Sequence, residues 1–555
     1  MSAVGLVLTQ PRAWPSYRPE TSLELVALLV SVFFSVSCNS AFWHAYAAVS
    51  GAGASHGWIT TISLFVAMTG LNMLLLCVLL NRWTAKPVLT VLLLLTAFAV
   101  YYMNQYKVYL DPDMIRNVLH TEMKESRELI TPGLIAPLLL YAALPITLVW
   151  RIRLRERPLG RALLIRIATL AVTLMVTTGA ILLSFQEVSA LMHNHREIRH
   201  LITPGNYLVS LARVASDDSA SANLPRLIVG GDAKVVGRVA GKPRLLVLVV
   251  GETVRAQNWG LNGYSRQTTP ELSRLDVLNY SDVTACGSST EVSLPCMFSV
   301  QGRRNYDKQE IKRSESLLHV LERAGIATLW RDNQTGCKGV CDQLAFESYL
   351  DARIPAYCDE QRCIDEVLLH DLAPQLDKRS GDQVVVLHQL GNHGPSYFSR
   401  YPPAFKRFTP ACETPQLGDC SRAEVVNAYD NAILYTDHFL GETIRFLQTQ
   451  TTRDTAMIYV SDHGESLGEN NLYLHGVPYQ IAPKTQLKVP MVMWLSSGLK
   501  AERGIDVGCL RKNLSRPVSH DNLFSSILGL MQVQTKAYDR TQDVFAACTP
   551  TNAGW

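Results

Sequence analysis

Residues 457–465 read Met-Ile-Tyr-Val-Ser-Asp-His-Gly-Glu, an apolar run that stops abruptly at Asp462 and His463. Such a run is typical of a buried strand that delivers polar side chains to the edge of a sheet. A second stretch has the same form, because the apolar residues 245–250 lead through one glycine to Glu252. Carboxylate and imidazole groups are ligands of divalent metals. The two stretches therefore predict one metal site at the carboxyl edge of an α/β sheet.

The size and composition of the chain indicate more than one domain. With 555 residues it is too long for a single ordinary core. Its mean hydropathy is slightly positive although 18% of its residues are charged. This combination is typical of a membrane part joined to a water-soluble part. A net charge of only +4 gives no broad basic field, so we expect no nucleic-acid partner.

Five segments are apolar enough to cross a bilayer, which takes about 20 residues each. They are 25–47, 58–80, 87–103, 134–150 and 163–183. Lys and Arg lie in the N-terminal tail, after the second segment and after the fourth, whereas residues 51–57 carry none. The positive-inside rule then predicts a cytoplasmic N-terminus and, after five spans, a C-terminal part on the other side. No convincing cleavage site follows the first segment, so we expect a retained anchor.

Cysteine usage independently indicates an oxidising compartment for the C-terminal part. Ten of the twelve cysteines lie there, in close pairs. Pairing of neighbours is the simplest arrangement: 286–296, 337–341, 358–363, 412–420 and 509–548. A zinc–thiolate cluster is the disfavoured alternative, because such sites usually use repeated C-x-x-C spacing.

These features predict three parts. They are a five-span domain, 1–186, with an external loop, 104–131; a bridging helix (187–215) and linker, together 187–223; and a water-soluble domain, 224–555. In the last part predicted strands alternate with predicted helices. The strands are 244–250, 327–331, 383–390, 456–460 and 489–495, and the helices include 291–300, 316–324, 363–376 and 422–448. This alternation predicts a mostly parallel sheet with helices on both faces.

The segment Cys-Gly-Ser-Ser-Thr-Glu-Val-Ser at 286–293 precedes a predicted helix. Hydroxyl groups at a helix N-terminus lie beside free N–H groups and the positive end of the dipole, which suits a phosphate. Ser288 and Ser289 are explained equally well as N-caps. A metal-bound hydroxyl becomes a nucleophile near neutral pH. Thr290 is therefore the candidate nucleophile for a covalent phospho-intermediate.

Other polar residues leave two interpretations open. His393 and His475 lie in glycine-flanked loops, where a histidine is more often structural. As a pair they would suit phosphate oxygens, a second metal or a leaving group. In the external loop Asn117, Thr121 and Glu125 share one helix face. From spacing alone, a solvated polar face is the favoured interpretation of these three.

Together these stretches resemble the phosphoethanolamine transferase family, membrane enzymes that modify lipid A and confer polymyxin resistance. The matching stretches are VVGET, ACGSSTEVSLPCMFS, DNQTGCKGVCD, GNHGPSYFSRYP, SDHGESLGENNLYLHGVPY and KVPMVMW. The resemblance covers essentially the whole chain. It implies five spans followed by an α/β ectodomain like those of alkaline phosphatases and sulfatases. Asn392 departs from the Ser of many members, and the absent C-x-P-x-R signature argues against sulfate-ester hydrolysis.

Carried over residue by residue, the resemblance implies that Glu252, Thr290, Asp462 and His463 hold a catalytic zinc, with Thr290 as nucleophile. The substrate-binding positions that it implies are Asn117, Thr121, Glu125, Thr335, Lys338, His393 and His475. For the two histidines it implies contact with the phosphoryl group or an additional zinc. For the loop residues it favours substrate contact over the solvated face.

The expected reaction transfers phosphoethanolamine from phosphatidylethanolamine to lipid A through a phospho-threonine, with Zn²⁺, one ion or more, as cofactor. We expect a monomer in the bacterial inner membrane, in contact with membrane lipids, with a periplasmic catalytic domain. Core heptose or a periplasmic glucan is the alternative acceptor, and phosphoglycerol the alternative group transferred. A non-catalytic membrane sensor is the alternative from another class. The acceptor position, the number of zinc ions, domain motion and regulation stay open.

Overall fold

The computed structural model describes residues 18–50, 57–121, 123–221, 225–236, 241–360 and 362–550. The chain forms two compact units. One consists of Met1–Tyr101 and Leu134–Gly205, the other of Tyr102–Gly133 and Asn206–Trp555. The predicted external loop therefore clusters with the C-terminal part. Most of the basic N-terminal tail and nearly all of the loop 51–57 lie outside the described residues.

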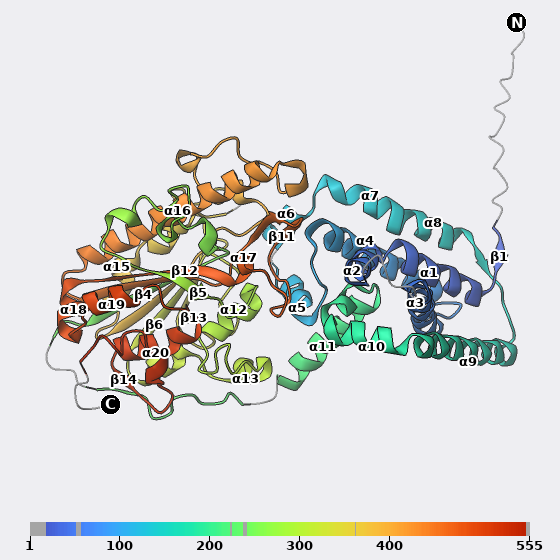
Figure 1. Ribbon diagram of the computed structural model, residues 1–555, viewed down its shortest axis with the longest axis horizontal. Coiled ribbons are helices and arrows are strands. Elements are labelled where there is room, and N and C mark those ends of the chain that lie inside the picture. The colour runs from blue at the N-terminus through green and yellow to red at the C-terminus, as the bar shows by residue number, and fades with distance from the viewer. Residues whose placement is uncertain are drawn as a thin grey trace, which may run out of the picture. The chain divides into compact units, whose positions relative to one another are not determined.

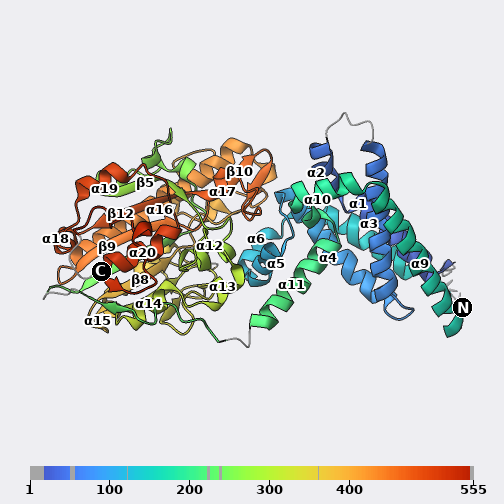
Figure 2. The same cartoon turned by 60° about the horizontal axis from the view of Figure 1, so that its bottom comes forward.

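The first unit is built of apolar helices, seen most clearly in Figure 2. Four helical segments within the described residues are long and apolar enough to cross a membrane: α3 (Gly57–Leu79), α4 (Ala85–Tyr106), Pro132–Arg151 and α9 (Leu159–Leu183). The helices α1 (Leu23–Ser37) and α2 (Ser40–Ser50) pass the same test as a pair bent by 51°. The described residues thus contain four candidate spans, or five if the bent pair counts as one. Helix α3 packs against α1 and α9.

The candidate span that follows α4, and its neighbours, are less regular. Pro132–Arg151 comprises a 3-10 turn η1 (Pro132–Leu134), α7 (Ile135–Pro137), a π-helical stretch η2 (Leu138–Ala143) and α8 (Leu144–Arg151). Short parallel strands β1 (Glu20–Thr21) and β2 (Arg153–Leu154) pair with each other.

The single bridging helix predicted over 187–215 is wrong. The structure has α10 (Phe185–Asn194), a 3-10 stretch η3 (Arg196–Leu201) and then α11 (Gly205–Ser221). Helix α11 begins directly after Pro204, whose ring nitrogen carries no N–H to donate to a preceding helical turn. The periodicity of apolar residues continues across this break, which is why the sequence alone suggested one helix.

The second unit is organised around an eight-stranded sheet in the order β13-β5-β12-β9-β4-β8-β6-β7 (Figure 1). The strands are β4 (Arg244–Gly251), β5 (Leu278–Thr284), β6 (Ala327–Asp332), β7 (Phe346–Ser348), β8 (Gln383–His388), β9 (Asp454–Ser461), β12 (Lys488–Leu495) and β13 (Val518–Ser519). All neighbours pair in parallel except β12, which is antiparallel to both β5 and β9. The predicted strands are all present. Strand β5 was missed, because its polar residues interrupt the apolar pattern, and the short strands β7 and β13 were missed as well.

Helices cover both faces of this sheet. Alternate residues of β4 point to opposite sides: Leu246 and Leu248 belong to one hydrophobic cluster, Leu245 and Val247 to the other. The first cluster includes residues of α12 (Thr290–Met297), α14 (Leu317–Arg323) and α20 (Asp521–Leu530). The second includes residues of α15 (Leu372–Asp377) and α16 (Arg422–Thr449), and Figure 1 shows α16 and α20 on opposite sides of the strands. Burial of apolar surface on both faces accounts for the unbroken apolar runs of the central strands.

The remaining elements of this unit are short. They include α5 (Pro112–His120), α6 (Met123–Leu129), α13 (Lys308–Arg313), α17 (Lys484–Leu487), α18 (Ser497–Arg503), α19 (Val507–Asn513), the hairpin β10 (Ser466–Glu469) with β11 (Leu472–Leu474), and β3 (Lys234–Val235) with β14 (Val533–Gln534). The helix predicted over 363–376 is divided into a 3-10 stretch η7 (Asp365–Leu369) and α15. All five neighbour disulfides predicted from the cysteine spacing are present.

Candidate metal centre and nucleophile

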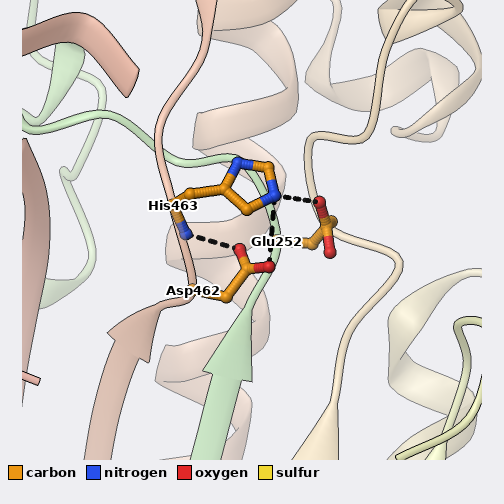
Figure 3. A group of neighbouring side chains, drawn as sticks. All are labelled: Glu252, Asp462 and His463. Atoms are coloured by element: carbon orange, nitrogen blue, oxygen red, sulfur yellow. Dashed lines mark hydrogen bonds and ion pairs between the residues drawn. The ribbon is translucent and has the colours of Figure 1, made fainter. Parts of the chain in front are cut away.

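The two strand ends singled out in the sequence meet at the carboxyl edge of the sheet (Figure 3). Strands β4 and β9 pair in parallel with Gly251 opposite Ser461, so the next residues, Glu252 and Asp462, leave the sheet side by side. The Asp462 N–H donates to the carbonyl of Gly251 over 2.9 Å, which carries the pairing one residue further. His463 follows directly. The local register thus places three potential ligands at one point.

The distances within this group suit a single cation. One ligand atom from each of Glu252, Asp462 and His463 lies within 4.8 Å of the others. His463 Nε2 is 3.4 Å from Glu252 Oε1 and 3.2 Å from Asp462 Oδ2, contacts drawn in Figure 3. All three side chains are fully buried. Two carboxylates and an imidazole form a donor set that zinc accepts.

The nucleophile candidate contacts the same group. Thr290 is the first residue of α12 and is 5% exposed. Its Oγ1 lies 3.1 Å from Glu252 Oε2 and 3.2 Å from His463 Nε2. Ser289 occupies the N-cap position but makes no side-chain cap hydrogen bond, and the Ser288 hydroxyl donates instead to the carbonyl of Val477. Side-chain capping, the alternative explanation of these serines, is therefore not observed.

The electrostatics of the group indicate a missing positive charge. His463 Nδ1 lies 2.9 Å from the carbonyl of Gly464, which fixes the proton on Nδ1 and leaves the Nε2 lone pair facing the carboxylates. Asp462 Oδ2 is buried without a hydrogen-bond partner among the described residues. Burial raises the pKa of Asp462 and lowers the pKa of His463 well below its usual range. A divalent cation would satisfy the facing lone pairs, so the residues present fit a metal.

Backbone geometry at the site is strained or tightly packed. Thr253, a β-branched residue, has φ of 56°, a conformation that such residues rarely adopt. It is held there because its N–H donates to Asp462 Oδ1 and its carbonyl accepts from Tyr429. Gly391 has φ of 55°, and a Cβ added there would lie 2.9 Å from the carbonyl oxygen of Glu252. Only glycine allows this approach.

Two of the expected substrate-binding residues lie beside the metal group. The ring of His475 lies 4.3 Å, between centroids, from that of His463 and 5.5 Å from that of His393. His475 Nδ1 is 3.4 Å from the buried carboxylate of Glu465. The Gly476 N–H donates to the carbonyl of Ser288, so this loop is joined to the segment before α12. The structure therefore brings both histidines to the site.

The other expected substrate-binding residues lie in the loop after β6 and in or next to α5 and α6. Thr335 and Lys338 contact each other, since Lys338 Nζ donates to the Thr335 carbonyl over 3.1 Å. Asn117, on α5, lines a cavity of about 140 Å³ together with Ser288 and Ser289. Thr121, directly after α5, donates its hydroxyl to the Asn117 carbonyl. Glu125 lies in α6, where its side chain is outside the described atoms.

Two residues at the site escaped the sequence analysis. Gln334 is 4% exposed and donates from Nε2 to Glu252 Oε2 over 3.0 Å. Glu291, next to the nucleophile, is 3% exposed and contacts three basic side chains. Burial acts to raise the pKa of Glu291, but the hydrogen bond from His120 and the charge of Lys312 outweigh it and hold the pKa below its usual range. The only feature of the sequence that could have identified Gln334 was its position between the end of β6 and Thr335.

Comparison with known proteins agrees with this architecture. A family model described as phosphoethanolamine transferase EptA/EptB matches residues 68–219, and a sulfatase model matches 244–533. The chain is 35% identical to phosphoethanolamine transferase EptA of Escherichia coli K12 over 536 residues, 96% of this chain and 98% of that protein. It is 35% identical to phosphatidylethanolamine transferase Mcr-1 of Escherichia coli over 540 residues, 95% and 98% of the two chains.

Solved structures extend the likeness to three dimensions. The integral membrane lipooligosaccharide phosphoethanolamine transferase A of Neisseria meningitidis superimposes with a TM-score of 0.91 at 35% identity, covering 96% of this chain and 99% of that one. Its soluble domain, at 43% identity, covers 59% of this chain and 99% of that one, with a TM-score of 0.58. The predicted fold class, membrane helices plus a sulfatase-like domain with a mostly parallel sheet, is confirmed. The chain belongs to the phosphoethanolamine transferase family.

Proposed function

We propose that this chain transfers phosphoethanolamine from phosphatidylethanolamine to lipid A, with Thr290 as nucleophile and zinc as cofactor. The observation that carries the proposal is the position of Thr290 Oγ1, 3.1 Å from Glu252 and 3.2 Å from His463 at the shared strand edge. Relatives named Kdo(2)-lipid A phosphoethanolamine 7''-transferase are 26–29% identical, and they support lipid A as the acceptor class.

In the first half-reaction Thr290 Oγ1 attacks the phosphorus of the donor lipid. A bond forms between Oγ1 and phosphorus, the bond from phosphorus to the glycerol oxygen breaks, and diacylglycerol leaves. The hydroxyl proton departs on the side of Glu252 Oε2, and the leaving glycerol oxygen takes up a proton, for which His393 and His475, whose rings lie beside that of His463, are the candidate donors. Zinc bound by Glu252, Asp462 and His463 would lower the pKa of the hydroxyl and offset charge on the phosphoryl oxygens.

In the second half-reaction a phosphate oxygen of lipid A attacks the phosphoethanolamine held on Thr290. The bond from phosphorus to Oγ1 breaks, and Thr290 regains its proton. Lys338 is a candidate to stabilise negative charge on the phosphoryl group as a point charge. The added ammonium group would reduce the negative charge of lipid A and weaken its attraction for cationic peptides. This scheme places the catalytic domain in the periplasm and the protein in the bacterial inner membrane.

The test of the proposal is Thr290→Ala, expressed in cells whose lipid A is then examined by mass spectrometry. We expect lipid A from cells with the unaltered chain to be heavier by one phosphoethanolamine group, and lipid A from cells with Thr290→Ala to lack this increase. Thermal unfolding and zinc content of the purified variant show that the fold and the metal site are kept. Transfer by Thr290→Ala at an undiminished rate would refute the nucleophile assignment, and a phosphoglycerol mass would refute the donor.

Glu252→Ala tests the metal separately. Because Glu252 supplies one of three buried ligand groups, we expect this variant to lose zinc as measured by elemental analysis of the purified protein. The matched control is Glu442→Ala, which removes a carboxylate from the surface of α16. Zinc content equal in Glu252→Ala and in the control would contradict the ligand role.

A further inference from the structure

Two short helices of the loop between α4 and the candidate span Pro132–Arg151, α5 and α6, belong to the same compact unit as the sheet. A charged side chain of α5 contacts the helix that begins with Thr290. A charged side chain of α6 contacts the segment that contains His393. The inference below rests on the proposed function and concerns how this loop is held.

The first contact is centred on Glu291, the neighbour of the nucleophile. Arg116 and His120 lie one turn apart on α5 and both face this carboxylate. Arg116 Nε is 3.8 Å from Glu291 Oε1, and His120 Nδ1 is 3.0 Å from Oε2. Lys312 Nζ, from α13, is 3.4 Å from Oε1. Arg116 is 1% exposed and Glu291 3%, so water does not screen their attraction.

The second contact is centred on Arg400. Its Nη2 is 2.8 Å from Glu128 Oε2 on α6, and its Nε donates to the carbonyl of His393 over 2.6 Å. Arg362 pairs with the same Glu128. Arg400 is 5% exposed. Glu128 therefore reaches the backbone of His393 through a single buried guanidinium group.

Both contacts are costly to break. Removing one partner of a buried ion pair leaves the other charge without compensation in a low-dielectric environment. The loop is thus fixed at two points, one next to Thr290 and one next to His393. Asn117, between Arg116 and His120 in the sequence, lines the cavity beside Ser289 in this arrangement.

We propose that Glu291 and Arg400 are positioning residues, which hold α5 and α6 so that loop groups contacting the lipid donor keep a fixed geometry relative to Thr290 and His393. They take no part in the chemistry at phosphorus. A lipid substrate that contacts the loop depends on them, because a displacement of about 1 Å from the attack geometry costs on the order of 100-fold in rate. A small phosphodiester that reaches Thr290 without contacting the loop does not.

The experiment compares two substrates on the full-length, zinc-loaded protein in detergent. One is a fluorescent phosphatidylethanolamine, and the other is the water-soluble bis(4-nitrophenyl) phosphate. For Glu291→Gln and for Arg116→Met we expect kcat on the lipid to fall about 30-fold, with KM changed less than threefold. The rate at which the variants hydrolyse the soluble diester should stay within threefold of the rate of the unaltered chain. The double variant should have a kcat on the lipid no lower than that of the less active single variant, because each single substitution already removes the same ion pair.

Three further variants guard against simple misfolding. Glu291→Asp keeps the charge and should recover most of the lipid activity. His120→Gln changes a side chain that is 47% exposed, and it should lower lipid turnover severalfold without a change in thermal stability. The matched control is Glu315→Gln, which breaks the pair with Arg323 away from the loop and should leave the ratio of the two activities unchanged.

The outcomes separate this inference from the proposed function. If the Glu291 and Arg116 variants lose activity on both substrates equally, or on neither, the positioning role is wrong while the assignment of Thr290 stands. If Thr290→Ala keeps activity on the soluble diester, the proposed function is wrong, whatever the Glu291 and Arg116 variants show. Glu128→Gln repeats the test at the second contact, with the same expected split between lipid and soluble substrate.

Discussion

At the residue scale, the site depends on how the oxygens of Glu252 are shared. Oε2 accepts from Thr290 and from Gln334, while Oε1 lies beside His463. A carboxylate held by a second hydrogen bond keeps one orientation, and partners of this kind support metal affinity. The side-chain amide of Gln334 is itself fixed, since its Oε1 accepts from the Thr335 hydroxyl over 2.5 Å.

We predict that Gln334→Ala weakens zinc binding by about 10- to 100-fold, because Glu252 loses the donor that orients it. Competition with a chromogenic chelator measures the zinc affinity of the purified protein. The matched control is Gln448→Ala on the exposed surface of α16, which should bind zinc as tightly as the unaltered chain. Equal affinities for the two variants would show that Gln334 does not orient the ligand.

The sequence predicted Glu252, Asp462 and His463 as a group because each comes directly after a buried apolar strand. Parallel strands end at one edge, so the grouping needs no knowledge of loops. Gln334 and Glu291 have no such signal. A glutamine in a loop and a glutamate in the first turn of a helix are ordinary in solvated positions, and only the packing of other segments buries them.

At the element scale, α12 places the nucleophile, and its start is fixed from several directions. Ser293, one turn into the helix, donates to the carbonyl of Asp462 over 2.5 Å. The disulfide between Cys286 and Cys296 joins the segment before the helix to its last turn. Strand prediction was reliable for β4, β8 and β9, whose residues are all buried, and failed for β5, where buried and half-exposed residues alternate irregularly.

We predict that replacing Cys286 and Cys296 together by Ser lowers the free energy of unfolding by about 2–4 kcal/mol and also slows lipid transfer. The rate falls because the start of α12 gains freedom relative to the metal group. The matched control replaces Cys509 and Cys548, a pair away from α12. It should lose comparable stability, measured by urea unfolding, yet retain its transfer rate at a temperature where both variants are folded. A similar loss of rate in both would remove the disulfide from any role in placing Thr290.

At the scale of the whole molecule, the second unit joins segments distant in sequence around one buried histidine. His520, just before α20, accepts a hydrogen bond at Nδ1 from the Cys286 N–H and donates from Nε2 to the carbonyl of Ser461. This pattern requires the neutral ring. It connects the end of β9, the segment before α12 and the start of α20, so the metal edge and the nucleophile helix share one support.

The protonation of His520 therefore couples the stability of the second unit to pH. Burial lowers the pKa of His520 to about 4, from about 6.5 in the unfolded chain. Between these values the unfolded state binds the proton and the folded state does not, so stability is present above pH 6.5 and is lost as pH falls towards 4. From pH 7 to pH 5 this one group should cost about 2 kcal/mol. Unfolding by urea, followed by tryptophan fluorescence at both pH values, measures the change.

The variant His520→Gln isolates this contribution, because other buried groups also titrate. Asp437 and Asp543, whose pKa values burial raises to about 7 and about 6, act in the opposite direction and are unchanged in the variant. Glutamine can accept from Cys286 and donate to Ser461 without binding a proton. We expect it to be less stable than the unaltered chain at pH 7 and to lose about 2 kcal/mol less on acidification. The same loss in both proteins would mean that folding does not lower the pKa of His520, which would contradict this account of its role.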